Sequence, residues 1–389
     1  MALRLLRFIQ GKGSGSMKDW LAVWLGLMLL LGPTVASAQE IPIGCYIPMT
    51  GAAAAMGQVT WQGIEIAHRL QPQVLGRPVK LVLVDTKSDK IEAANAVSRL
   101  IERDKVVAII GEVISGNTLA GTPIAERFGI PNITPTATNP LVTQNRRYAF
   151  RACFVDSLQG KVAARFAREH LKAQKAALII DQAQDYCVGL AKYFQEEFQR
   201  LGGQIVATTF IQTGDQDFSA QISAIKPLAP DIIYAPNYYA EDALLARQMQ
   251  ELGLTIPILT GDGAQVTDLV KIGGAAVEGM YFTAHFHREA VATPLAQEFI
   301  KAYEAATQRE VDAFAALGAD CYFLLLQAIS QTQGTAGAQL RQALASTKDF
   351  PGVSGTLTMG PDNNPTKEVM ILQVKNGKFV LVSKMAPEP

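Results

Sequence analysis

Short apolar runs alternate with longer amphipathic stretches along most of this chain. Within the stretches, apolar residues recur every three or four positions, as at Leu190, Phe194 and Phe198, which is typical of helices that bury one face. The apolar runs are typical of buried strands, and they begin near residues 41, 79, 106 and 130 and again near 176, 204, 231 and 256. This alternation predicts βαβ units with a parallel sheet, and the two series predict an α/β fold with two doubly wound lobes.

The end of the chain departs from this alternation. We expect helices over 294–307, 311–330 and 338–346, then strands over 354–358, 368–374 and 378–383, with a hairpin turn at Asn376-Gly377. If the helices return to the first lobe and the strands join the second, the chain crosses between lobes near 152–156, 281–285 and 350–354. The prediction is a first lobe of 39–153 plus 285–350, a second of 154–284 plus 351–389, and a three-segment hinge that suits closure.

Residues 1–38 predict a signal peptide that is cleaved on export. Basic residues precede an apolar block at 20–31, and Ala36-Ser37-Ala38 then resembles a cleavage site. An uncleaved anchor is the alternative, but the block of about 12 residues is shorter than the roughly 20 that cross a bilayer. Met17 is an alternative start, and Cys45 is a weak match to a lipidation site. We expect a periplasmic protein.

Composition excludes several classes of function. The chain has a formal net charge of zero, 49% hydrophobic residues and 18% charged residues, so it can build a large core. It has no basic run with interleaved aromatic residues, which argues against nucleic acid as a partner. Its four cysteines form no CxxC motif, and although export permits disulfides, the sequence does not pair them.

Two neighbouring strand-like runs end in loops rich in hydroxyl groups. The run at 106–110 leads into residues 111–118, and the run at 130–133 leads into residues 134–140. Ligands of open α/β sheets bind outside the carboxyl ends of the strands. Hydroxyls and the free N–H groups at a helix start suit a small anion such as a carboxylate, although the same residues can simply cap helices.

Motifs for other chemistries are weak. Residues 111–118 nearly match a phosphate-binding loop, but Asn117 replaces the lysine that grips phosphate. His285 and His287 could share a metal, yet no cysteine or acidic cluster accompanies them. GxSxG, HExxH and GxGxxG motifs do not occur. We therefore expect no enzyme activity, no cofactor and no metal, and a hydrolase on a similar scaffold is the weaker alternative.

An ordered set of motifs resembles one protein family. The motifs lie at 47–51, 111–118, 131–140, 185–189, 215–218 and 261–263. Together they resemble the type I periplasmic solute-binding proteins of ABC transporters, in the leucine/isoleucine/valine-binding family. The resemblance implies a monomer that captures an amino acid, branched-chain or otherwise apolar, and delivers it to an ABC permease. The alternative is a transport or receptor protein of the same fold for an amide, urea or organic acid.

The same resemblance implies individual ligand-binding roles. Ser115 and Thr138 would hold the ligand carboxylate, in one loop with Ala137, while the Thr136 carbonyl and Asp262 would hold the ammonium group. Tyr186 and Tyr238 would close over the ligand from the second lobe, and Met56 and Phe314 would line its side-chain pocket.

Departures from the family pattern and plainer interpretations accompany these roles. Some members have tyrosine at Met56 and glutamate at Asp262, and some have a disulfide cysteine at Ile114. The plainer interpretations are a turn former for Asp262 and core packing for the aromatic residues and Met56.

Overall fold

The computed structural model describes residues 39–385, and the predicted signal peptide lies outside this range. The described residues form two mixed sheets, dominated by parallel pairing and covered by helices, which confirms the predicted α/β fold of two lobes. A third, small sheet is antiparallel.

The first sheet has six strands in the order β2-β3-β1-β4-β5-β6. All of its strands pair in parallel except β2, which pairs antiparallel with β3. The central strand β1 is buried on both faces, because Ile43 and Ile47 face one helical layer while Tyr46 faces the other. The strands are β1 (Ile41–Ile47), β2 (Gln73–Val74), β3 (Arg77–Asp85), β4 (Ala108–Gly111), β5 (Asn132–Thr134) and β6 (Ala149–Arg151).

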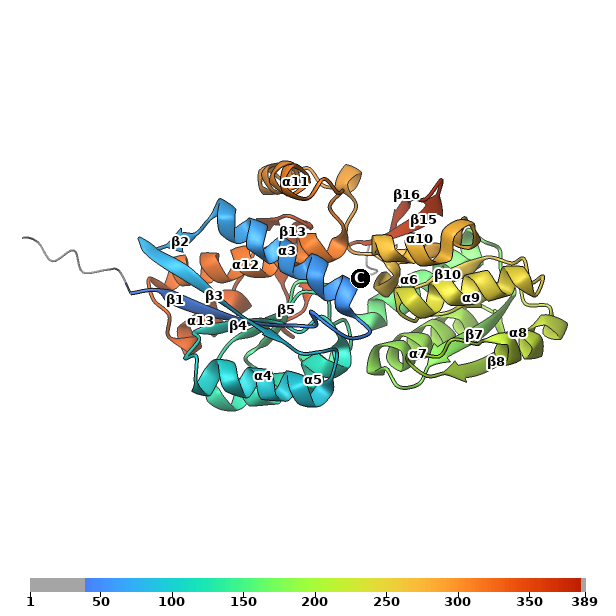
Figure 1. Cartoon of the computed structure of the whole chain (residues 1–389), viewed down its shortest axis with the longest axis horizontal. Coiled ribbons are helices and arrows are strands. Elements are labelled where there is room, and N and C mark those ends of the chain that lie inside the picture. Colours follow the sequence, from blue (N-terminus) through green and yellow to red (C-terminus); the bar gives the residue numbers. More distant parts are fainter. Residues whose placement is uncertain (1–38, 386–389) are drawn as a thin grey trace, which may run out of the picture. The chain divides into compact units, whose positions relative to one another are not determined.

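Helices cover both faces of this sheet (Figure 1). One face packs against α3 (Ala54–Leu70) and α12 (Ala313–Thr332), and the other against α4 (Lys90–Glu102) and α5 (Ser115–Phe128). By length and composition α12 could cross a membrane, but 89% of its apolar window is buried, as expected for the core helix of a folded lobe. α11 (Pro294–Thr307) and α13 (Gly337–Ala345) pack against the same core.

The second sheet has seven strands in the order β16-β15-β11-β10-β9-β7-β8. Its last two strands form the predicted hairpin, in which Asn376 and Gly377 have φ angles of 53° and 69°, as a type I′ turn requires. The strands are β7 (Lys175–Asp181), β8 (Gln204–Ile211), β9 (Ile232–Tyr234), β10 (Ile258–Thr260), β11 (Tyr281–Ala284), β15 (Val369–Lys375) and β16 (Lys378–Met385).

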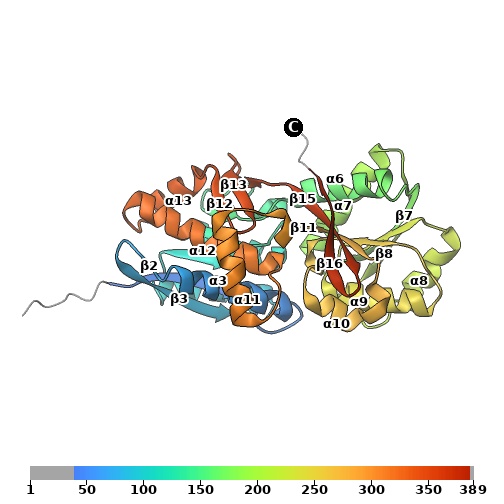
Figure 2. The ribbon, with the colours of Figure 1, turned by 90° about the horizontal axis from the view of Figure 1, so that it is seen from above.

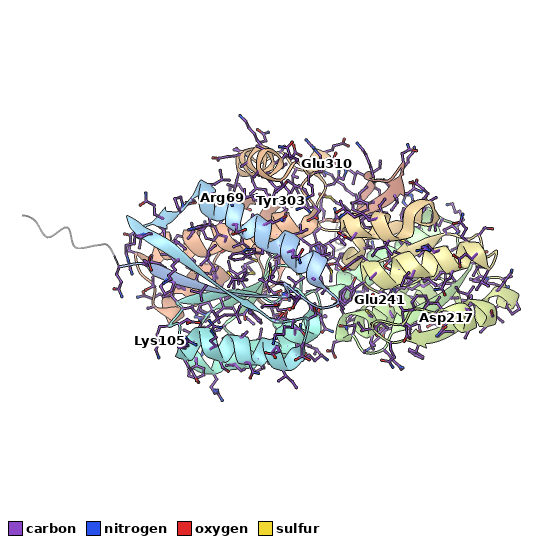
Figure 3. The ribbon with its side chains drawn as sticks, viewed as in Figure 1. Arg69, Lys105, Asp217, Glu241, Tyr303 and Glu310 are labelled. Atoms are coloured by element: carbon purple, nitrogen blue, oxygen red, sulfur yellow. The ribbon has the colours of Figure 1, made fainter. Side chains whose placement is uncertain are left out.

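Two helical layers also cover the second sheet. α6 (Asp156–Glu169) and α7 (Asp185–Arg200) pack on one face, and α8 (Ser219–Ile225), α9 (Tyr239–Glu251) and α10 (Thr267–Gly273) on the other. Charged side chains such as Lys105 and Asp217 lie on the outside of the lobes, whereas Tyr303 of α11 is buried (Figure 3).

Three segments connect the lobes, and the third is not where the sequence placed it. β12 (Phe350–Gly352), β13 (Gly355–Met359) and β14 (Pro365–Thr366) form the small sheet, which lies beside α12 and α13 (Figure 2). Its hydrogen bonds go to the first lobe: the Thr293 hydroxyl donates to the Gly352 carbonyl, and the Val353 N–H donates to Asp320 of α12.

The third crossing is therefore at residues 367–368, after 152–155 and 285–287. The second crossing was expected near 281–285, but β11 (Tyr281–Ala284) occupies most of that range and the crossing begins where the strand ends. The expected crossing at 350–354 is wrong, because an alternating pattern identifies a strand without identifying the sheet that it joins.

The cysteines contribute to the core. All four are buried and free of disulfides. Cys45 lies in the middle of β1, which is the position of a core residue and does not fit the alternative of a lipidation site.

Candidate functional site

The carboxyl ends of strands from both sheets converge on one small cavity. Ser115 begins α5 after β4, and Thr136 follows β5. Tyr186 is in the first turn of α7 after β7, and Tyr238 and Asp262 follow β9 and β10. The lining residues are Met56, Val113, Ser115, Thr136, Tyr186, Tyr238, Asp262, Gly263 and Phe314. The structure thus brings together every predicted site residue except Ala137 and Thr138.

Ala137 and Thr138 are fully buried and do not line the cavity. The Ala137 N–H donates to the Thr134 hydroxyl at 3.0 Å, and its carbonyl accepts from the buried guanidinium of Arg151 at 2.7 Å. The Thr138 carbonyl accepts the N–H of Asp156 at 3.0 Å. These hydrogen bonds show that the backbone of both residues helps to hold the loop in place. Their ligand-binding roles stay predictions.

One side of the cavity is suited to an anion. The Ser115 hydroxyl accepts the N–H of Asn139 at 3.2 Å, so its own proton can be donated elsewhere. The N-cap residue Ile114 offers no side-chain cap, and the first N–H groups of a helix have no partner within the helix. The Thr136 hydroxyl donates to the Val113 carbonyl at 2.9 Å, which ties the two loops together.

The other side of the cavity holds a carboxylate braced by three donors. Oδ1 of Asp262 accepts from Gln159 Nε2 and from Tyr186 Oη, each at 2.8 Å. Oδ2 lies 2.9 Å from Nε2 of His285. Burial lowers the pKa of His285, so the ring is neutral near pH 7 and Nε2 carries the proton that it donates. Three neutral donors orient the carboxylate without cancelling its charge.

Two tyrosines form the wall next to this carboxylate. The rings of Tyr186 and Tyr238 stack with centroids 5.3 Å apart and an interplanar angle of 14°. Burial raises the pKa of both phenols well above the usual value, so both stay neutral. Glycine at position 261 leaves room for the Tyr186 hydroxyl, because a Cβ there would lie 2.1 Å from that oxygen. Met56, Val113 and Phe314 add an apolar wall.

The lobes are in contact around the cavity. Lys90 Nζ on the first lobe lies 2.7 Å from Asp185 Oδ2 on the second, and Asn139 Nδ2 donates to the Asp185 carbonyl at 3.0 Å. The Tyr239 hydroxyl donates to the Ala52 carbonyl at 3.3 Å. The free volume inside is about 10 Å³, enough for about one water molecule. A larger molecule therefore enters only when the lobes separate or the lining side chains move.

Gln159 and His285 are the contacts of Asp262 that the sequence did not indicate. The sequence leaves His285 and His287 as a possible metal pair, but in the structure the two rings have different partners. His285 hydrogen-bonds to Asp262, and its ring packs on Phe154 with the ring centroids 3.6 Å apart. His287 Nε2 instead lies 3.2 Å from the Phe379 carbonyl oxygen. Within residues 39–385 no group of three or more His, Cys, Asp or Glu is placed to hold a metal ion.

Comparison with known proteins identifies relatives across nearly the whole described chain. Residues 40–378 match the family described as periplasmic binding protein. The Leu/Ile/Val-binding protein BraC3 of Rhizobium johnstonii is 30% identical over 348 residues, covering 88% of this chain and 93% of the relative. An amino acid binding protein of Pseudomonas aeruginosa is 31% identical over 265 residues, covering 67% of this chain and 71% of the relative.

Solved structures share the fold. The leucine binding protein LivK of Thermotoga maritima has 44% identity and a TM-score of 0.88, covering 89% of this chain and 99% of its own. LivJ of Streptococcus pneumoniae in complex with isoleucine has 32% identity and a TM-score of 0.84, with 90% and 100% covered. A solute binding protein of R. palustris in complex with benzoate has 25% identity and a TM-score of 0.82, with 90% and 97% covered.

Proposed function

This chain belongs to the type I periplasmic binding proteins of the Leu/Ile/Val-binding family, and we propose that it captures an apolar α-amino acid for an ABC permease. One observation carries the proposal: the Asp262 carboxylate and the start of α5 with Ser115 line the same cavity. An α-amino acid needs an acceptor for its ammonium group and donors for its carboxylate, a short distance apart. The apolar wall of Met56, Val113 and Phe314 supports an apolar side chain.

A simple organic acid is the second candidate, because a benzoate complex exists among the structural relatives. Such a ligand has a carboxylate but no ammonium group. In this cavity it would meet the negative charge of Asp262, which is only 4% exposed, without a cation to offset it. The buried carboxylate of Asp262 therefore favours an amino acid over an organic acid as the ligand.

The magnitudes fit a binding protein. Hydrogen bonds to charged groups contribute roughly 1.5–3 kcal/mol each. About four of them, offset by the cost of ordering the ligand, are compatible with micromolar or tighter binding at about −8 kcal/mol. We propose that the protein acts as a monomer in the periplasm, without catalysis, by closing its two lobes over the ligand through the three crossing segments.

The test identifies the ligand directly. Protein isolated from its host is denatured, the released small molecules are analysed by mass spectrometry, and the refolded protein is titrated in a calorimeter with leucine, isoleucine, valine, benzoate and acetamide. We expect a branched-chain amino acid in the released fraction and micromolar or tighter binding of the same compound. Tighter binding of benzoate or acetamide than of any amino acid would overturn the proposal.

A further inference from the structure

Glu112 organises the anion-binding side of the cavity without lining it. Its side chain is fully buried and accepts three hydrogen bonds. Oε1 accepts from the Thr86 hydroxyl at 2.6 Å and from Asn117 Nδ2 at 3.0 Å, and Oε2 accepts from the Ile114 N–H at 2.5 Å. One carboxylate thus joins Thr86, which directly follows β3, to the N-cap residue Ile114 and to Asn117 in the first turn of α5.

The backbone of the same residue connects the two ligand loops. The carbonyl of Glu112 accepts from the Thr118 hydroxyl at 3.2 Å and from the Thr134 hydroxyl at 2.5 Å. Thr134 Oγ1 in turn accepts the N–H of Ala137. The next residue, Val113, lines the cavity, and Ser115 follows two positions later. A change at Glu112 therefore reaches Ser115 through the backbone.

We propose that Glu112 is the positioning residue of the carboxylate-binding loop at 113–118 and that its charge makes the affinity of this loop for a carboxylate depend on pH. The proposal rests on the function proposed above. Glu112 touches no ligand in it: the residue acts through the Ile114 N–H, the Asn117 amide and the peptide that carries Val113.

The charge argument follows from the partners of Glu112. All three donors to its carboxylate are neutral. Burial outweighs these hydrogen bonds and raises the pKa of Glu112 to about 7. Near neutral pH the residue therefore gains or loses its charge directly behind the loop that holds a ligand carboxylate. Two like charges in a buried site repel, so affinity decreases as the pH rises through 7.

Neighbouring groups do not mask this titration. The phenols of Tyr46 on β1 and Tyr238 before α9 face Glu112, and burial raises the pKa of both, so they stay neutral. The side chains of Lys90 in α4 and Asp185 in α7 lie next to Gly116 at the start of α5, where they form an ion pair with each other. Glu112 is thus the group behind the loop at 113–118 that changes charge near pH 7, whereas Asp156, whose pKa burial raises to about 8, contacts the neighbouring loop at Thr138.

The experiment compares the parent with Glu112→Gln and Glu112→Ala. Leucine affinity is measured by calorimetry at pH 6, 7 and 8. For the parent we expect a decrease of about fivefold from pH 6 to pH 8, which corresponds to a rise of about one in the pKa of Glu112 on binding, from about 7 without ligand. Glu112→Gln should give a flat profile, and Glu112→Ala should bind at least tenfold more weakly at every pH. A Glu112→Gln profile as steep as that of the parent would overturn the proposal.

Hydrogen exchange without ligand separates this proposal from the function proposed above. The amides of 114–118 should exchange faster in both Glu112 variants than in the parent. Asp320→Asn is the matched control, because Asp320 is another buried acid of the first lobe that accepts backbone N–H groups, away from the cavity. If the parent binds no amino acid, the proposed function fails, and exchange alone decides the positioning role. Unchanged exchange at 114–118 in Glu112→Gln would refute that role even if Glu112→Ala fails to fold.

Discussion

Replacing Asp262 with asparagine tests the recognition of an ammonium group while leaving the shape of the site intact. The amide oxygen can keep both bonds at Oδ1, from Gln159 and Tyr186. The amide nitrogen would then face His285 Nε2, and the ring can accept that bond by moving its proton to Nδ1, which has no partner within the described structure. We therefore expect Asp262→Asn to fold normally and to lose only the negative charge.

The size of the effect follows from burial. Asp262 is 4% exposed, so its pairing with a ligand ammonium is largely shielded from water. Removing one partner of such a pair costs on the order of 3–5 kcal/mol, because the other charge stays buried without compensation. With about 1.4 kcal/mol for each factor of ten, leucine affinity should fall at least a hundredfold.

The assay is calorimetry with two ligands, leucine and 4-methylpentanoate, which differ by the amino group. Asp262→Asn should weaken leucine binding and leave 4-methylpentanoate binding unchanged or stronger. Ser115→Ala should weaken both, because both ligands have the carboxylate. If Asp262→Asn binds leucine as tightly as the parent, Asp262 is only a turn former, and the ligand class must be reassigned to an acid or an amide.

Three further predictions concern closure, pH and export. Saturating ligand at about 100 times its Kd should add roughly 2.7 kcal/mol to the free energy of unfolding and reduce the radius measured by small-angle scattering; an unchanged radius despite tight binding would exclude closure. Lys90→Ala removes an exposed ion pair between the lobes that is worth about 0.2–1 kcal/mol. This variant should therefore weaken binding by less than about sixfold, and only at low salt. Burial raises the pKa of Asp156 to about 8, so the folded state keeps a proton that the unfolded state has lost, and stability should decrease as pH rises from 5 to 8. Asp156→Asn should flatten that decrease in urea unfolding, by at most about 1.4 kcal/mol per pH unit, and parallel curves for parent and variant would contradict the assignment. N-terminal sequencing of the periplasmic protein should begin at or near Gln39, and a mature protein that keeps residues 20–31 would contradict cleavage.

Local patterns were sufficient to predict most of the fold. The apolar pattern located β1, β7 and the hairpin of β15 and β16, because a few successive apolar or turn-forming residues are sufficient to identify each of them. The same patterns misplaced residues 350–366, since strand propensity does not specify a partner sheet. The hydrogen bonds from Thr293 and to Asp320 that attach this segment to the first lobe come from helices earlier in the chain.

The site was predicted only in part for a similar reason. Ser115, Tyr186 and Asp262 lie in motifs with a recognisable order, and the structure brings them to one cavity. Gln159 reaches Asp262 across 103 positions of sequence, so nothing near either residue indicates the contact. Glu112 lies inside a recognised motif, but its burial and its donors depend on β3 and β5.

The bracing of Asp262 has a consequence for anyone who redesigns this protein as a sensor. Gln159 lies in the first turns of α6, directly after the crossing at 152–155, and His285 begins the crossing at 285–287. Substitutions chosen to make these two crossing segments stiffer or looser would therefore also reorient the Asp262 carboxylate, to which we assign the ligand's ammonium group. In this scaffold, the stiffness of the connection between the lobes and the selectivity for the ligand cannot be adjusted independently, unless the changes are confined to the third crossing at 367–368.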